Sequence, residues 1–179
     1  MKKLFLAIIL FVPVLSYAAC PCDDDVEEDG VYHEYDYVGL KAGTGHYLAP
    51  TVQGRSKSYG MFYGHRSSKL FGYEAEYSFL GTYIDAASPG HAIAFSLSGL
   101  HYYDLSEDFS LVGRLGLAST KTSNAVALRQ HAFDLTYGVG LDWRIAKDMH
   151  MRTEFNRYSL KMPEKIKATN AFVGLAYQY

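Results

Sequence analysis

Eight segments of this chain alternate residue by residue between apolar and polar side chains, and clusters of turn residues separate the segments. Because successive side chains of a β-strand point to opposite faces, a period of two residues predicts strands rather than helices. Helical periodicity is confined to Ala125–Ala132, which predicts a short helical turn. The last segment shows the strand pattern most clearly, and one of its faces consists of Ala171, Val173, Leu175, Tyr177 and Tyr179.

The two faces of these segments differ in polarity in a way that predicts the architecture. The other apolar rows are Val38, Leu40 and Ala42; Tyr59, Met61 and Tyr63; Tyr73, Ala75, Tyr77 and Phe79; Ile93, Phe95 and Leu97; Phe109, Leu111, Gly113, Leu115 and Leu117; Phe133, Leu135, Tyr137, Val139, Leu141 and Trp143; and Met149, Met151, Thr153 and Phe155. The opposite faces carry Lys41, Gly60, Glu74, Glu76, Ser96, Ser98, Arg114, Asp134, Thr136, Asp142, Arg152, Glu154 and Asn156.

A water-soluble barrel such as a lipocalin has its apolar face inside and its charged face outside. Here the nearly charge-free face ends in Tyr and Trp, which is typical of a wall in contact with lipid. Eight strands enclose an interior that side chains can fill, and closure leaves no unpaired strand edge in the membrane. The sequence therefore predicts an all-β fold, an eight-stranded antiparallel up-and-down transmembrane β-barrel with a polar interior.

The average composition is compatible with such a barrel. Of the 179 residues 49 % are hydrophobic and 20 % are charged, and the mean hydropathy is −0.10. A transmembrane barrel interleaves lipid-facing and inward rows, so its mean hydropathy resembles that of a soluble chain. The 16 Tyr, 10 Phe and 16 Gly suit strands with close-packed faces, and only two Cys exclude a disulfide scaffold.

The connections between the segments alternate in length. Short turns are expected at residues 66–69, 106–108 and 146–148, and longer loops at 45–57, 81–91, 119–129 and 159–167. Up-and-down barrels with short periplasmic turns and longer outer loops have this arrangement. The turns that contain Asp108 and Asp148 are similar in sequence. Arg114 follows Asp108 by six residues, and Glu154 follows Asp148 by six residues. We therefore expect these two side chains at a similar height inside the barrel.

Residues 1–18 have the parts of a secretory signal peptide. Two lysines precede the apolar run Leu4–Leu15, and small residues precede the expected cleavage after Ala18. The run is shorter than the roughly 20 apolar residues that span a bilayer. Cleavage before Cys20, as in a lipoprotein, is a weaker alternative because Tyr17 stands where such signals carry Leu.

Residues 19–34 are expected to form a flexible acidic segment ahead of the barrel at 35–179, since they lack the apolar content to fold alone. A cation site is the alternative, but the spacing of the acids in Asp23–Asp36 does not match an EF-hand loop. Cys20 and Cys22 are too close in sequence for an unstrained disulfide. We assign them no catalytic role, and the role of the acidic segment stays open.

Five stretches carry a family resemblance in their order and spacing. They are Tyr37–Gly43, Tyr59–His65, Leu70–Gly81, Leu111–Leu117 and Arg152–Tyr158. Together they resemble the small eight-stranded outer-membrane barrels, the OmpA-type transmembrane domain and its OmpX-like relatives. The resemblance covers residues 37–179 and implies a bacterial outer-membrane location after export. It also implies recognition by the barrel-assembly machinery, whose C-terminal signal matches Gly174, Tyr177 and Tyr179 but departs from the usual polar residue at Phe172.

Charged residues on the inward faces predict a charge network inside the barrel: Lys41, Glu74, Glu76, Arg114, Asp142, Arg152 and Glu154. In the OmpA-type family such carboxylate–guanidinium pairs have been interpreted as a switchable plug, and Glu74, Arg114, Arg152 and Glu154 are the matching positions here. The alternative, which we favour, is a permanent polar core in which buried charges are retained because they are paired.

The sequence favours a monomeric, non-enzymatic protein with a structural or surface-interaction role; a small gated solute or ion pore is the alternative. A lipid A-modifying enzyme is disfavoured, because the His-x-Ser-Asn signature of similar deacylases is replaced by residues 157–160, Arg-Tyr-Ser-Leu. We expect no catalytic residue, cofactor or metal site, and no nucleic-acid partner, because basic residues form no stripe. Outer loops are the candidate site for host or surface ligands. Basic residues near them are candidate contacts for lipopolysaccharide phosphates: Arg55, Lys57, Lys121, Arg129, Lys161, Lys165 and Lys167.

Overall fold

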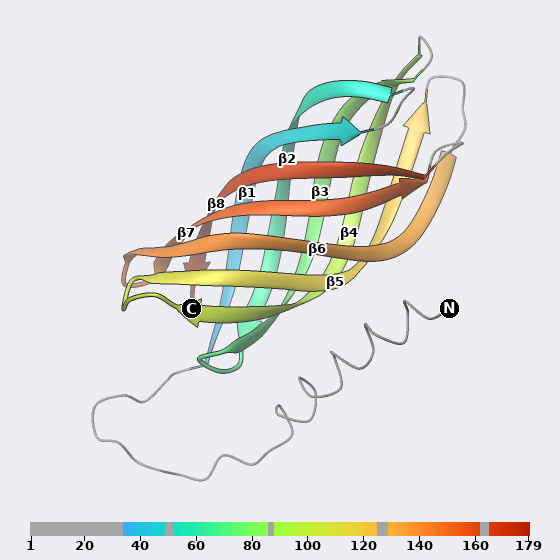
Figure 1. The fold of residues 1–179 in the computed structure, drawn as a ribbon. Coiled ribbons are helices and arrows are strands. Elements are labelled where there is room, and N and C mark those ends of the chain that lie inside the picture. Colours follow the sequence, from blue (N-terminus) through green and yellow to red (C-terminus); the bar gives the residue numbers. More distant parts are fainter. Residues whose placement is uncertain (1–33, 49–51, 86–87, 125–128, 162–164) are drawn as a thin grey trace, which may run out of the picture. The chain divides into compact units, whose positions relative to one another are not determined.

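The computed structural model describes residues 34–48, 52–85, 88–124, 129–161 and 165–179. They form a closed barrel in which every strand pairs antiparallel with its neighbours in sequence, and β1 closes against β8 (Figure 1). The strands are β1 (Tyr35–Leu48), β2 (Val52–Arg66), β3 (Phe71–Asp85), β4 (Ser88–Asp104), β5 (Phe109–Asn124), β6 (Arg129–Ala146), β7 (Met149–Lys161) and β8 (Lys165–Gln178). The predicted eight-stranded antiparallel barrel is confirmed.

Within the described residues no helix is long and apolar enough to cross a membrane. The predicted helical turn at Ala125–Ala132 is wrong for residues 129–132, which form the start of β6, while 125–128 lie outside the described residues. The predicted signal peptide also lies outside them, as does the acidic segment apart from Glu34.

The strands are staggered around the barrel. Paired residues can be followed from strand to strand once around the barrel, starting at Asp36 on β1. The path runs through His65, Tyr73, Gly99, Leu115, Tyr137, Arg157 and Thr169. It returns to β1 at His46, ten residues beyond Asp36. A stagger of this size on eight strands corresponds to a tilt of about 35–45° from the barrel axis, the usual range for barrels that side chains fill.

The two ends of the barrel are named here by their connections. At the turn end, short turns join β2 to β3, β4 to β5 and β6 to β7, as the sequence predicted. At the loop end, the strands continue far into the segments that we expected to be long loops. For example, β1 extends to Leu48 and β2 begins at Val52 within the loop expected at 45–57.

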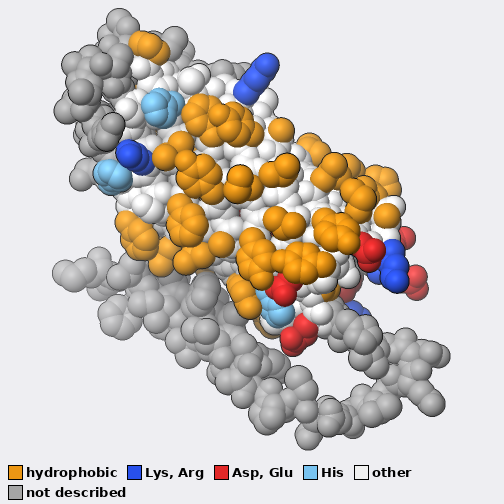
Figure 2. All heavy atoms as spheres, turned by 180° about the vertical axis from the view of Figure 1, so that it is seen from behind, with side chains coloured by type: hydrophobic (Ala, Val, Ile, Leu, Met, Phe, Trp, Pro, Cys, Tyr) orange, Lys and Arg blue, Asp and Glu red, His pale blue; other side chains and the backbone are white. Residues whose placement is uncertain are grey.

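Alternation explains why the wall is apolar. Side chains of the predicted apolar rows point outward, and Leu40 and Phe133 are 67 % and 72 % exposed. Figure 2 shows these apolar side chains covering the wall, with acidic side chains gathered at one end of it. The alternate residues point inward and are buried, as Glu74 and Asn156 illustrate with 1 % exposure each.

The polarity of the two faces is reversed near the loop end. On β1, Leu40 faces outward and Lys41 inward, whereas six residues further His46 is exposed and Tyr47 is buried. On β7 the corresponding change runs from Phe155 outward to Leu160 inward. The strands thus continue beyond the apolar band with an apolar inside and a polar outside, which is why the sequence pattern failed to identify them as one strand.

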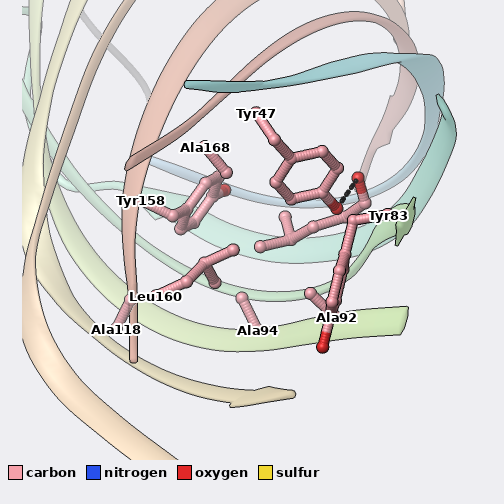
Figure 3. Packing of buried hydrophobic residues seen from close by; sticks show 9 residues of the cluster. Tyr47, Tyr83, Ala92, Ala94, Ala118, Tyr158, Leu160 and Ala168 are labelled. Atoms are coloured by element: carbon pink, nitrogen blue, oxygen red, sulfur yellow. Dashed lines mark hydrogen bonds between the residues drawn. The ribbon is translucent and has the colours of Figure 1, made fainter. Parts of the chain in front are cut away.

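Two apolar clusters fill the barrel interior on either side of its polar middle. The cluster at the loop end (Figure 3) consists of Tyr47, Leu80, Tyr83, Ala92, Ala94, Ala118, Tyr158, Leu160 and Ala168. The cluster at the turn end consists of Tyr37, Phe62, Leu100, Tyr102, Val112 and Ala176. The interior is therefore polar in its middle, as the sequence predicted, and apolar on either side of that middle.

Two glycines allow this interior to close. The backbone of Gly81 has φ +113° next to a bulge in β3, and a Cβ there would lie 2.6 Å from the Ser56 side chain. Gly64 lies opposite Tyr37, and a Cβ at Gly64 would lie 2.2 Å from Cζ of the Tyr37 ring. The absence of a side chain at position 64 therefore makes room for the tyrosine inside the barrel.

Candidate functional site

The polar middle of the barrel contains all seven charged residues that the sequence placed inside. Five strands supply them: Lys41 from β1, Glu74 and Glu76 from β3, Arg114 from β5, Asp142 from β6, and Arg152 and Glu154 from β7. Each lies at one of the alternate strand positions whose side chains point into the barrel, and each residue is at most 7 % exposed. We call this set the interior charge network.

Arg114 and Lys41 form the half of the network nearer the loop end. Arg114 contacts three carboxylates, at 2.8 Å to Glu74, 2.5 Å to Glu76 and 3.4 Å to Glu154. The Lys41 ammonium lies 2.8 Å from both Glu76 and Glu154. The contact between Arg114 and Glu154 agrees with their expected similar height. Glu76 is therefore shared between two cations, and Glu154 between three, because Arg152 also lies 3.6 Å from Glu154.

Arg152 forms the half nearer the turn end. Its guanidinium lies 2.6 Å from Glu74 and 2.8 Å from Asp142. Asp142 also contacts His150, whose Nδ1 is 2.9 Å away and whose Nε2 is 3.0 Å from the Gln178 side chain. Contacts of Arg114 and Arg152 with Glu74 join the two halves into one connected network.

Neutral groups donate further hydrogen bonds to three of the four carboxylates. Tyr37 donates a hydrogen bond to Glu74 (3.0 Å), Tyr158 donates to Glu76 (2.7 Å) and Asn156 donates to Glu154 (2.8 Å). Ser78 also donates to Glu76. Tyr37, Tyr158 and His150 were not identified from the sequence as partners of the network. The alternation of inward and outward side chains along β1 and β7 does place all three at inward positions.

Aromatic rings complete the surroundings of the cations. The Lys41 ammonium lies 4.4 Å from the centroid of the Phe172 ring, and the Arg152 guanidinium lies 5.1 Å from that of Tyr37. Such contacts stabilise a cation that has lost its water. Phe172, which departs from the assembly signal, thus has a packing role beside Lys41.

Chemically, this arrangement pairs charges and fills space. It contains three permanent cations and four carboxylates, and each charged group contacts at least one of opposite sign. In the part of the chain that the structure describes, no three His, Cys, Asp or Glu side chains lie together as metal ligands would. The apolar clusters border the network toward both ends of the barrel.

The candidate lipopolysaccharide contacts lie on strands rather than on loops. Lys57 on β2 and Lys167 on β8 are exposed, and Lys121 on β5 is half-buried. Arg55, Arg129, Lys161 and Lys165 lie on β2, β6, β7 and β8, and their side chains are outside what the structure describes.

The residues of the candidate assembly signal lie together on β8 and at the chain end beyond it. Tyr177 faces outward and is 53 % exposed, while Gly174 faces inward opposite Lys41. The backbone N–H of Tyr179 donates a 3.0 Å hydrogen bond to the carbonyl oxygen of Asp36 at the start of β1.

A closed barrel of eight antiparallel strands, apolar outside and charged inside, defines a transmembrane β-barrel protein. The sequence model of the family described as outer membrane protein beta-barrel domain matches residues 5–179, so the chain belongs to this family. Membership places the protein in the bacterial outer membrane. No protein with a curated description matches the sequence significantly.

Three solved structures illustrate the similarity in fold. Neisserial surface protein A is 12 % identical, with a TM-score of 0.63 over 80 % of this chain and 97 % of its own. The N-terminal β-barrel domain of Pseudomonas aeruginosa OprF is 16 % identical, with a TM-score of 0.59 over 82 % and 100 %. The attachment invasion locus protein Ail of Yersinia pestis, solved with the heparin analogue sucrose octasulfate, is 14 % identical, with a TM-score of 0.55 over 82 % and 97 %.

Proposed function

We propose that the protein is a monomeric, non-enzymatic outer-membrane barrel with a closed interior, and that its role is structural or is performed by its outer surface. By analogy with the family, the turn end faces the periplasm and the loop end faces the exterior. Export by a cleaved signal peptide and insertion by the barrel-assembly machinery through Gly174, Tyr177 and Tyr179 belong to this proposal.

The observation that carries the proposal is the layered filling of the barrel. An ion crossing the barrel would have to pass the turn-end cluster, the interior charge network and the loop-end cluster in turn. Tyr83, Leu80 and Leu160 in the last of these are at most 1 % exposed. Moving an ion from water through buried side chains carries a desolvation penalty of several kcal/mol. The filling therefore supports a plug rather than a pore.

A small gated pore is the second candidate, and one feature favours it. Arg114 already contacts Glu74, Glu76 and Glu154, so a shift toward one carboxylate would need only a small movement. Such an exchange would rearrange the middle layer, but it would leave both apolar clusters in place. We therefore favour the closed barrel.

Conductance in planar lipid bilayers tests the choice. The closed barrel predicts that the wild type, Arg114→Ala and Glu154→Ala are all silent, because both apolar layers remain. Open-channel currents in the wild type, or currents that appear in either variant, would establish the gate and refute the plug. Heat-dependent mobility on denaturing gels would verify that each variant is folded.

Outer-membrane lipids, and lipopolysaccharide in particular, are the proposed partners of the outer surface. The exposed lysines at positions 57 and 167 lie near the loop end, where phosphate groups of an anionic leaflet would pair with them. Binding of a host or surface ligand belongs to the same surface role. Comparing the mass spectra of lipid A with and without expression of the protein would detect an enzymatic modification, which this proposal excludes.

A further inference from the structure

Four adjacent strands carry polar residues at the level where the outward row stops being apolar. Beyond Phe155 on β7 comes Arg157, and beyond Ala171 on β8 comes Thr169. Beyond Ala42 on β1 come Thr44 and His46, and beyond Tyr59 on β2 comes Lys57. The side chains at all these positions point outward, so the polar residues mark the loop-end border of the lipid-facing band on this side of the barrel.

The strand register makes these residues neighbours. Arg157 pairs with Thr169, which pairs with His46, and Thr44 pairs with Lys57. One outward position further toward the loop end, Ser159 pairs with Lys167. The result is a continuous patch of cations and hydroxyl groups across β7, β8, β1 and β2, which we call the basic patch: Arg157, Lys167, Lys57, His46, Thr44, Thr169 and Ser159.

Arg157 is the unusual member of the basic patch. It lies one outward position deeper than Lys167 and follows Phe155, which is 60 % exposed on the lipid-facing wall. Its Nε atom is shielded from solvent and has no hydrogen-bond partner among the described residues. An arginine at the edge of hydrocarbon is unfavourable unless an anion pairs with it, and the outward rows of these four strands carry no carboxylate above Asp36 in their described parts. No carboxylate of these described outward rows is therefore available to Arg157, and an anion of the surrounding lipid would supply the partner.

We propose that the basic patch binds a phosphate group of lipid A in the outer leaflet, with Arg157 as the deep ligand and Lys167 and Lys57 nearer the surface. This site deepens the proposed surface role and rests on it. A guanidinium binds phosphate in a bidentate manner, and hydroxyl groups of Thr169 and Ser159 lie beside it to donate further hydrogen bonds. The phosphate of lipid A lies at the border between acyl chains and sugar, and Arg157 lies at the corresponding border of the barrel wall, where the apolar outward row of β7 ends.

The site is confined to one side of the barrel. On the opposite wall, Lys121 lies at the loop end of β5, beside Ile93 and His91 of β4. β5 is separated from β7, the nearest strand of the basic patch, by β6. Lys121 is itself a candidate lipopolysaccharide contact, so its substitution compares a loop-end charge outside the basic patch with the charges inside it, and Lys69 in a turn at the other end is the neutral control.

Native mass spectrometry of the folded full-length protein in detergent, titrated with bisphosphorylated lipid A, tests the site. Loss of one charge-assisted contact should raise the Kd of Arg157→Gln and of Lys167→Gln roughly tenfold. Lys69→Gln, at the turn end, should bind like the wild type, and Lys121→Gln, a candidate lipopolysaccharide contact outside the basic patch, should raise the Kd by less than Arg157→Gln does. Dephosphorylated lipid A should bind the wild type and Arg157→Gln equally weakly. Heat-dependent gel mobility verifies folding, and Lys57→Gln replaces Arg157→Gln if that variant does not fold.

The remaining outcomes separate failure of the site from failure of the wider proposal. Equal weakening in Arg157→Gln, Lys167→Gln and Lys121→Gln, or no weakening in Arg157→Gln, would refute a localised site but leave general contacts with lipopolysaccharide intact. No binding of lipid A by the wild type would refute both the site and the proposed lipopolysaccharide contacts. Binding of soluble sucrose octasulfate that Arg157→Gln abolishes, without binding of lipid A, would reassign the basic patch to a sulfated glycan and overturn the proposal.

Discussion

Replacing Arg114 by Met is the most informative single change inside the barrel. Met fills much of the volume of the side chain but removes its charge and five N–H groups. Glu74, Glu76 and Glu154 then lose a shared cation, and Ser98 loses the hydrogen bond that Arg114 Nε donates at 3.2 Å. The interior is left with four carboxylates and two permanent cations.

The expected loss follows from what the carboxylates retain. Glu74 keeps Arg152 and Tyr37, and Glu76 keeps Lys41 and Tyr158, so neither is left without a partner. Breaking a buried ion pair by removing one partner typically destabilises a protein by about 3–5 kcal/mol. We expect about 4 kcal/mol for Arg114→Met, which lowers the folding equilibrium constant roughly a thousandfold.

Unfolding by urea of the protein folded in lipid vesicles would measure this loss. The single tryptophan, Trp143, faces outward on β6 and is 39 % exposed, so its emission reports departure from lipid. The matched control is Arg144→Met, which removes an exposed guanidinium 3.1 Å from Asp108 at the turn end. An exposed ion pair contributes at most about 1 kcal/mol.

The double variant Arg114→Met/Glu76→Gln separates charge from packing. It restores the charge balance of the wild type, and the amide oxygen of Gln can still accept the hydrogen bond from Tyr158. We expect it to be more stable than Arg114→Met alone, with a coupling free energy of about 1–3 kcal/mol. If Arg114→Met loses no more stability than Arg144→Met, or if the two substitutions are additive, the paired network does not stabilise the barrel as argued above.

Three further predictions concern backbone fit and assembly. Gly64→Ala should reduce the free energy of unfolding by about 1–3 kcal/mol, because its Cβ meets the Tyr37 ring. The control Gly113→Ala, whose Cβ has only one neighbour at 3.9 Å, should change it by less than about 0.5 kcal/mol in the same urea titration. Equal effects of the two substitutions would contradict the close-approach explanation. Gly81→Ala should destabilise by about 1–3 kcal/mol because φ is +113° there, and an unchanged urea midpoint would refute this. Tyr177→Ala should lower the amount of assembled barrel in cells, quantified by heat-dependent mobility, while spontaneous refolding into vesicles stays at the wild-type rate; a parallel loss in both assays would argue against recognition by the assembly machinery.

The lipid-facing wall could be predicted because lipid acts on every outward residue in the same way. Rows such as Phe133–Trp143 on β6 need only be apolar to lie in the bilayer, and this requirement is visible residue by residue. The inward parity of Lys41, Arg114 and Glu154 follows from the same alternation. Which carboxylate each cation contacts could not be predicted, since Lys41 and Glu154 are far apart in sequence and meet only through the β1–β8 closure and the strand stagger.

The loop end was interpreted wrongly for a physical reason. Beyond the apolar band the outer face no longer meets acyl chains, so His46 and Ser159 are polar while Tyr47 and Leu160 are buried. Period-two alternation continues there with its polarity inverted, and the boundary resembles the start of a polar loop. The sequence by itself thus determined the class of fold, the strand number and the direction of the side chains within the apolar band, because these depend only on local alternation. Only the closed tertiary structure decided the pairing of the interior charges, the apolar layers that seal them and the basic patch beside Arg157, because each joins strands whose register is set by closure of the barrel.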